Sequence, residues 1–283
     1  MSLTTAKRLP LNKQGRVGDS WFLQEKHWEL GDFVTATPML HALAEAWGEP
    51  VPVFFETPYV GDLYEKCPFI KRFSSAPLFT APFADTKAPR TLWRKGNTSN
   101  YEAQYMAVFG DPLPTEFKAY APQLAAPKEF DPKGKRTIAF MHGCYSDALR
   151  EAKSIPPPKM YNIICDAVGA GYTPIIIGSR ADEPYWIKVL LEGYLSTLAE
   201  KCHNYLGLLD ICGSVQLLQT CDLFCSNDTG LYHVAAASDM KGMVLWNSTP
   251  LIPYRAPSPL VYHVTEDHVQ YFSDWISAAH PLQ

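Results

Sequence analysis

The fold is indicated most clearly by one stretch of the chain, Cys221-Asp222-Leu223-Phe224-Cys225-Ser226-Asn227-Asp228-Thr229-Gly230-Leu231-Tyr232-His233-Val234-Ala235-Ala236-Ala237. Its apolar beginning, its polar turn formers and its alanine-rich end predict a strand, a tight loop and a helix. Asp228 and Thr229 are natural N-cap residues, and Gly230 lets a ligand approach the backbone. The first N–H groups of such a helix suit an anion, with His233 about one turn into the helix. An ordinary capped helix with a buried histidine is the alternative interpretation.

Strands and helices alternate through the second half of the chain. This alternation predicts a parallel sheet, whose ligand site lies at the carboxyl ends of the strands. The expected strands are 137–142, 173–178 and 242–246, and the expected helices are 158–170, 182–199 and 210–220.

The first half contains one clear α/β unit. Thr37 is expected to cap a helix that starts at Pro38 and ends near Trp47, which places Gly31 and Asp32 on the loop before it. A strand is expected at 51–55. The fold class is therefore α/β with mainly parallel sheets.

A proline-containing segment, 122–132, is typical of a linker between domains. We expect an N-terminal domain over 1–125 and a C-terminal domain over 126–265. The last segment, 266–283, is expected to be a helix that packs back across the domains.

Composition favours an ordinary globular protein. Of 283 residues, 47% are hydrophobic and 19% are charged, and the net charge is −4, which gives no global case for nucleic acid or membrane binding. No signal peptide and no run of about 18 apolar residues is present, so a cytoplasmic protein without a transmembrane segment is expected. Seven scattered cysteines fit reduced thiols better than disulfides or a zinc site.

One stretch departs from the acidic whole. Residues 66–95 hold seven Lys and Arg against the single acid Asp85, for a net charge of +6. A solvated face is one interpretation. The functional one is a surface for an anionic acceptor, a phosphorylated glycan or nucleic acid. The residues assigned to the acceptor side are Gly31, Lys71, Arg72, Arg90 and Arg94.

Three loops that follow expected strands carry groups suited to a nucleoside diphosphate. Ser146, Arg150 and Lys153 follow the first strand and suit phosphate oxygens. Glu183 follows the second and suits a ribose diol, and the loop 227–230 is the third. The motifs of dinucleotide dehydrogenases, P-loop NTPases, His-Glu-x-x-His zinc hydrolases and α/β-hydrolases are absent from the sequence.

Two of the motifs in this sequence resemble those of a known protein family. Gly31-Asp32 followed by Thr37-Pro38, and Asn227-Asp228-Thr229-Gly230-x-x-His233-x-Ala235-Ala236, resemble the heptosyltransferases of glycosyltransferase family 9. The likeness covers about residues 30–257 and is strong in the second half. The chain departs from the family pattern at Ser154-Ile155-Pro156, where Trp-Pro is expected.

The resemblance implies a GT-B architecture of two facing Rossmann-like domains and an inverting, metal-independent transfer with no cofactor beyond the donor. It implies that Asp32 is the general base, that Lys153 binds phosphate and that Glu183 binds ribose. Asp228, Thr229, Gly230 and His233 match the diphosphate and sugar loop. An inverting transfer needs one base and a group that stabilises the leaving diphosphate, which this division supplies.

The expected function is transfer of a sugar from a nucleoside diphosphate-sugar to a hydroxyl of an anionic acceptor, a lipopolysaccharide-type glycan by the resemblance. One alternative is transfer to hydroxymethylated bases of DNA, for which the +6 stretch is the cue. Another is a non-catalytic module that binds a nucleotide sugar or a partner. The sequence gives no indication of the oligomeric state.

Overall fold

The computed structural model describes residues 16–17, 20–21, 23–25, 29–55, 57–72, 99–125, 130, 134–143, 153–190, 196–247, 255–265, 268 and 271–279. The chain divides into two compact units. The first comprises Met1–Pro122 and Ile252–Ala256, and the second comprises Gln123–Leu251 and Pro257–Gln283. The assignment of the units to acceptor and donor stays a prediction.

The first unit contains a three-stranded parallel sheet in the order β3-β4-β5. Its strands are β3 (Leu23–Glu25), β4 (Val51–Phe55) and β5 (Ile70–Arg72), and its helices are α1 (Leu30–Trp47), α2 (Pro58–Leu63) and α4 (Asn100–Phe109). A short antiparallel ribbon joins β1 (Arg16–Val17) to β2 (Ser20–Trp21). Helix α1 packs with Phe33 against Phe55 and Tyr64, at ring centroid distances of 5.0 and 4.7 Å.

Helix α1 begins eight residues earlier than expected. Its N-cap is Glu29, whose N–H donates to Asp32 Oδ2 at 3.4 Å, so Asp32 lies in the first turn and not on a loop. Pro38 lies inside the helix and has no N–H for the carbonyl of Val34. Thr37 Oγ1 donates to that carbonyl at 2.7 Å, which explains why the Thr-Pro pair does not start the helix.

The second unit contains a six-stranded sheet in the order β11-β10-β9-β6-β7-β8, and every neighbouring pair is parallel. The expected strands are β6 (Thr137–Met141), β7 (Thr173–Ile177), β9 (Leu223–Ser226) and β10 (Gly242–Trp246). Strands β8 (His203–Asn204) and β11 (Val261–Thr265) were not expected, nor were β1, β2, β3, β5, α2 and α4 of the first unit.

The expected helices of the second unit are present with small shifts. They are α6 (Pro157–Gly169), α9 (Ile211–Gln219) and α10 (Gly230–Ala237). The helix expected over 182–199 corresponds to a 3-10 turn at Arg180–Asp182, then α7 (Glu183–Leu190) and α8 (Ser196–Ala199), with 191–195 outside the described residues.

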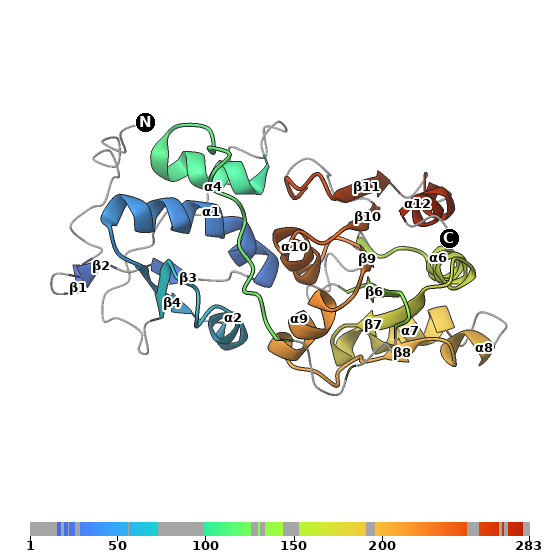
Figure 1. Ribbon diagram of the computed structural model, residues 1–283. Coiled ribbons are helices and arrows are strands. Elements are labelled where there is room, and N and C mark those ends of the chain that lie inside the picture. Colours follow the sequence, from blue (N-terminus) through green and yellow to red (C-terminus); the bar gives the residue numbers. More distant parts are fainter. Residues whose placement is uncertain are drawn as a thin grey trace. The chain divides into compact units, whose positions relative to one another are not determined.

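Helices cover both faces of this sheet (Figure 1). Alternate strand residues such as Ile138, Phe140 and Ile176 share one buried cluster with α6, α7 and α12 (Tyr271–Ala279). On the other face α10 packs on β10, with Tyr232 edge-on to Trp246. Helix α12 thus packs on α6 within the second unit, and its expected passage across to the first unit stays a prediction.

Candidate functional site

The carboxyl ends of three neighbouring strands form the framework of the candidate site. Strand β6 lies between β7 and β9, and Met141 is paired with Ile177 on one side and with Ser226 on the other. Because the three strands are parallel and in register, the loops that follow them begin at one edge of the sheet. The sequence-based expectation that these loops converge is therefore correct for the strand ends.

The loop after β9 leads directly into α10. Thr229 is the N-cap of this helix, and its Oγ1 accepts a hydrogen bond from Tyr232 N at 3.3 Å. Ser226 Oγ donates to Asn227 O at 2.8 Å and lies 3.2 Å from Thr229 Oγ1. The cap is therefore Thr229 alone, which leaves the carboxylate of Asp228 for other contacts.

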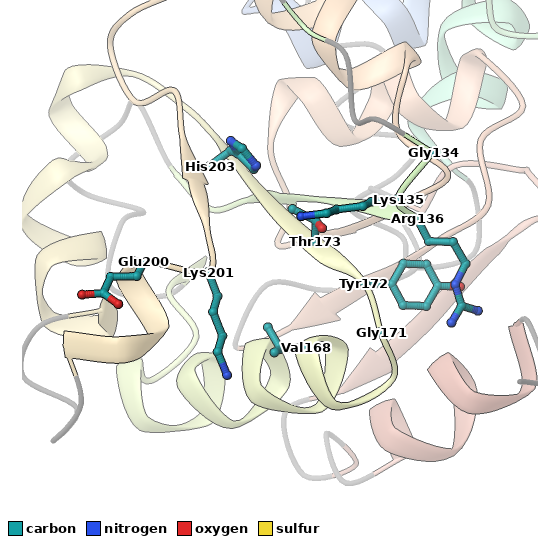
Figure 2. Close-up of a pocket in the computed structure, with 10 residues that line it drawn as sticks. All are labelled: Gly134, Lys135, Arg136, Val168, Gly171, Tyr172, Thr173, Glu200, Lys201 and His203. Atoms are coloured by element: carbon teal, nitrogen blue, oxygen red, sulfur yellow. The ribbon is translucent and has the colours of Figure 1, made fainter.

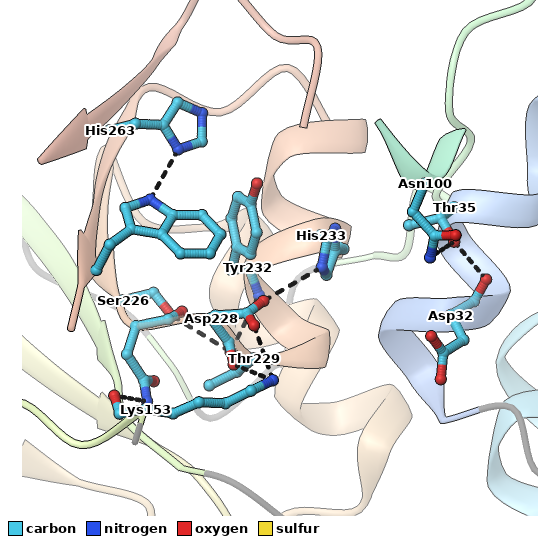
Figure 3. Close-up of polar contacts among 12 residues, drawn as sticks. Asp32, Thr35, Asn100, Lys153, Ser226, Asp228, Thr229, Tyr232, His233 and His263 are labelled. Atoms are coloured by element: carbon cyan, nitrogen blue, oxygen red, sulfur yellow. Dashed lines mark hydrogen bonds and ion pairs between the residues drawn. The ribbon is translucent and has the colours of Figure 1, made fainter. Parts of the chain in front are cut away.

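Asp228 joins two of the other expected site residues (Figure 3). Lys153 Nζ lies 2.8 Å from Asp228 Oδ2 and donates to Asp228 O at 3.3 Å, while His233 Nε2 lies 3.7 Å from Asp228 Oδ1. The side chains of Asp228 and His233 are 3% and 6% exposed, and that of Lys153 is 16% exposed. Lys153, Asp228 and His233 thus form a nearly enclosed cluster beside the N-terminus of α10.

Two opposing effects determine the pKa of Asp228. Burial raises the pKa, but the hydrogen bond with His233 and the charge of Lys153 outweigh it, so the pKa of Asp228 lies below its ordinary value of 3.8. Asp228 is therefore ionised at neutral pH and holds the Lys153 ammonium close to the start of α10. An anion at this place would meet a cation and the N–H groups at the start of the helix.

The residues that contact the Lys153 segment were not expected from the sequence. Asn227 Nδ2 donates to Lys153 O at 3.0 Å, and Asn247 Nδ2 donates to Ser154 O at 2.8 Å. His142 Nε2 accepts from Ile155 N at 3.0 Å, and its ring stacks on Tyr185 at a centroid distance of 3.5 Å. Asn227 lay within the quoted motif, but no local pattern could assign its partners, which are distant in sequence.

His142 is buried among these contacts. Burial lowers its pKa from 6.5 to about 3, so its ring is neutral at physiological pH. The neutral ring can accept the hydrogen bond from Ile155 N, which a protonated ring would be unable to do.

Glu183 is not part of the cluster. It is exposed in the first turn of α7, whereas its neighbour Asp182 accepts hydrogen bonds at Oδ2 from Ser179 N and Oγ, at 2.9 and 2.7 Å. Asp182 also lies against Gly143, where an added Cβ would come within 2.6 Å of its Oδ1. The ribose-binding role of Glu183 stays a prediction.

The remaining expected residues lie in other parts of the chain. Ser146, Arg150, Arg90 and Arg94 lie outside the described residues. Gly31 and Asp32 lie in the first turn of α1. Lys71 is exposed on β5, while Arg72 Nη1 is paired with Asp62 Oδ1 at 2.6 Å, so part of the positive charge of 66–95 is neutralised locally.

A polar network fixes the turn that carries Asp32. Thr35 Oγ1 donates to Asp32 O at 2.7 Å, and it accepts from Gln104 Nε2 at 2.7 Å and from Asn100 Nδ2 at 3.2 Å. Figure 3 shows Asn100 and Thr35 beside Asp32. Helix α4, which the sequence did not predict, thus supports the start of α1.

A surface pocket of about 630 Å³ lies at the opposite end of the sheet (Figure 2). Its residues precede or begin β6, β7 and β8, and they include Lys135, Lys201 and His203. Arg136, also at this pocket, donates to Ala170 O at 2.9 Å and lies over the ring of Tyr172. No expected site residue lines this pocket.

Two absences hold within the described part of the chain. Within it, no group of three His, Cys, Asp or Glu side chains is placed to hold a metal ion. Among the helices described there, none has the length and apolar character needed to cross a bilayer.

Solved structures with similar folds are glycosyltransferases. Heptosyltransferase II of E. coli, described as an ADP-heptose LPS heptosyltransferase, matches with a TM-score of 0.65 at 14% identity, over 91% of this chain and 97% of that one. A family 9 glycosyltransferase of Veillonella parvula gives 0.64 at 13% identity, over 90% and 88%. The E. coli heptosyltransferase WaaC, solved with ADP, gives 0.60 at 14% identity, over 90% and 99%.

At these identities the matches establish the fold, the GT-B arrangement expected from the sequence. No curated protein sequence matches the chain. The model of glycosyltransferase family 9 (heptosyltransferase) matches residues 100–271, which is more than half of the chain. The protein is therefore a glycosyltransferase and belongs to glycosyltransferase family 9.

Proposed function

We propose that the protein transfers a sugar from a nucleoside diphosphate-sugar to a hydroxyl of an anionic acceptor, with inversion and without a metal ion. The observation that supports this proposal best is the cluster of Lys153, Asp228 and His233 beside the start of α10. It combines a cation held by a buried carboxylate with the N–H groups of a helix start, at the carboxyl edge of a parallel sheet.

The reaction assigns separate tasks to Asp32 and to the cluster. Asp32 takes the proton of the acceptor hydroxyl while that oxygen attacks the anomeric carbon of the donor. The bond from the anomeric carbon to the diphosphate breaks on the opposite face, which inverts the configuration, and its electron pair leaves with the nucleoside diphosphate. Lys153 and the N–H groups at the start of α10 stabilise the charge of this leaving group.

ADP is the first nucleotide to test, because WaaC, a structural relative, is solved with ADP. A lipopolysaccharide-type glycan is the proposed acceptor, following the family. We place the reaction in the cytoplasm, where buried thiols such as those of Cys67, Cys221 and Cys225 stay reduced.

Transfer to hydroxymethylated DNA bases is the second candidate, and the +6 charge of 66–95 favours it. Arg72 weakens this cue because it is already paired with Asp62. DNA binding that weakens steeply with rising salt would support this candidate, and no binding at low salt would exclude it.

Two measurements test the leading proposal. In thermal-shift assays with ADP, UDP, GDP and CDP, one nucleotide at 100 times its dissociation constant should stabilise the protein by about 2.7 kcal/mol. Lys153→Ala should reduce that shift. Asp32→Asn should abolish release of the nucleoside diphosphate in the presence of acceptor while it leaves the thermal shift intact.

Each negative result of these measurements would contradict a different part of the proposal. No shift with any nucleotide would contradict the donor site. A shift without turnover on any acceptor of a broad panel would instead indicate the non-catalytic binding module. Full activity of Asp32→Asn would exclude Asp32 as the base.

A further inference from the structure

The backbone of three consecutive residues, Lys153, Ser154 and Ile155, is bonded by side chains from four other elements. Asn227, after β9, donates to Lys153 O at 3.0 Å, and Asn247, after β10, donates to Ser154 O at 2.8 Å. The side chains that bond Ile155 are His142, which accepts from its N–H at 3.0 Å, and Tyr185, whose hydroxyl donates to its carbonyl at 2.8 Å.

Lys153 is helical, whereas Ser154 and Ile155 lie in the short connection that leads to α6, so these two depend on side chains for backbone partners. Asn227 is fully buried and also joins the segment to the end of β6, through Gly143 N and Gly143 O, each at 3.3 Å. Pro156, the N-cap of α6, follows Ile155 and restricts the backbone further.

The fixed backbone of this segment restricts the position of the Lys153 ammonium, which is the cation of the candidate site. A lysine side chain on a mobile backbone loses conformational freedom whenever it binds an anion. With the backbone of Lys153 held by Asn227 and its ammonium held by Asp228, most of that freedom is already lost before a ligand arrives.

We propose that Asn227 and Asn247 are positioning residues that hold Lys153 with its ammonium at the start of α10, ready for the diphosphate of the donor. This inference rests on the proposed function. Each amide donates one hydrogen bond to a carbonyl of the segment, a contact that neither an alanine nor a carboxylate at the same position could supply.

A double-mutant cycle with Lys153→Ala separates positioning from general stability. Asn247→Ala should weaken binding of the nucleotide identified by thermal shift about tenfold, as expected when a charged contact is misplaced. In the Lys153→Ala background the same change should cost less than about twofold. Equal losses in both backgrounds would overturn the proposal.

Two further variants, a parallel test and a control, accompany the cycle. Asn227→Ala should behave like Asn247→Ala; since Asn227 is fully buried, Asn247→Ala carries the test alone if Asn227→Ala does not fold. Asn204→Ala is the matched control, because Asn204 is exposed at the end of β8 and its Oδ1 accepts from Leu206 N at 3.0 Å. The control should leave nucleotide affinity unchanged.

A second readout needs no nucleotide. The rate at which an N-hydroxysuccinimide ester acetylates Lys153, followed by peptide mass spectrometry, reports how firmly the ammonium is held. This rate should rise several-fold in Asn247→Ala and stay unchanged in Asn204→Ala. An unchanged rate in Asn247→Ala overturns the positioning role, whereas absence of nucleotide binding by the unmutated protein contradicts only the proposed function.

Discussion

Lys153 and Asp228, 75 positions apart in the sequence, form an ion pair of 2.8 Å whose carboxylate is 3% exposed. The loop after β6 and the loop after β9 are joined through this pair. Asp228 therefore has two effects: it neutralises a cation inside the fold, and it places that cation beside the start of α10.

Replacing Asp228 by asparagine should destabilise the fold by about 3 kcal/mol, near the lower end of the range for a broken buried pair. The value is at the lower end because Lys153 keeps 16% exposure and can turn towards water. Urea unfolding at pH 7 measures the change. Asp239→Asn is the matched control, since Asp239 is exposed just after α10 and adopts a φ of 55° that asparagine tolerates.

The free energies of unfolding of the unmutated protein and of Asp228→Asn should also differ in their dependence on pH. Because the pKa of Asp228 is lowered in the fold, its stabilisation is present above the ordinary value of 3.8 and is lost as pH falls below that value. The stability difference between the unmutated protein and Asp228→Asn should therefore shrink in strong acid. A difference that stays constant down to pH 2 would contradict an ionised Asp228.

His142 should lower the stability of the protein in acid over a wider pH range than Asp228 does. The pKa of His142 is lowered to about 3, so between pH 6.5 and 3 the unfolded chain binds a proton that the folded chain does not. This costs up to about 1.4 kcal/mol of stability for each pH unit in that window. His142→Gln can still accept from Ile155 N but does not titrate, so its unfolding free energy should fall less steeply with decreasing pH.

The control for this experiment is His268→Gln, because His268 lies on the surface beside Thr265 and Tyr271. That variant should keep the slope of the unmutated protein. Parallel pH profiles for His142→Gln and the unmutated protein would show that His142 is protonated in the fold.

Sequence signals were reliable where structure is determined locally. The strand, cap and helix at 223–237 were correct because apolar runs, an N-cap threonine and an alanine-rich segment act over a few residues. Lys153 and Asp228 were both assigned to donor binding. Their pairing with each other was not predicted, because it depends on β6 and β9 being neighbours in the sheet.

The errors have different causes. The pair Thr37-Pro38 has the pattern of a helix start, and only the hydrogen bond from Thr37 to Val34 O makes it a helix interior. Asn227, Asn247 and His142 could not be assigned partners, since each contacts the segment 153–155 from a different strand end. Strand β11 was missed because only two of its five residues, Val261 and Val264, are buried.

Gly242, the first residue of β10, should not tolerate a side chain. A Cβ at this position would lie 2.3 Å from the ring of Phe224, which is fully buried and unable to move aside. Gly242→Ala is expected to cost about 3 kcal/mol in urea unfolding, the upper range for overpacking. Gly169→Ala, at the end of α6 with no atom within 4 Å of the added Cβ, is the control and should be neutral or slightly stabilising.

Thr37 should be coupled energetically to Pro38. Thr37 is fully buried, and its hydroxyl donates to Val34 O at 2.7 Å and accepts from Tyr120 N at 2.8 Å. Thr37→Val leaves both groups without these partners and should cost about 2 kcal/mol in urea unfolding. In a Pro38→Ala background residue 38 regains an N–H that can bond Val34 O, so the same substitution should cost only about half as much. Equal costs in both backgrounds would mean that the hydroxyl does not replace the hydrogen bond that proline removes, and α1 would then need another explanation for continuing through Pro38.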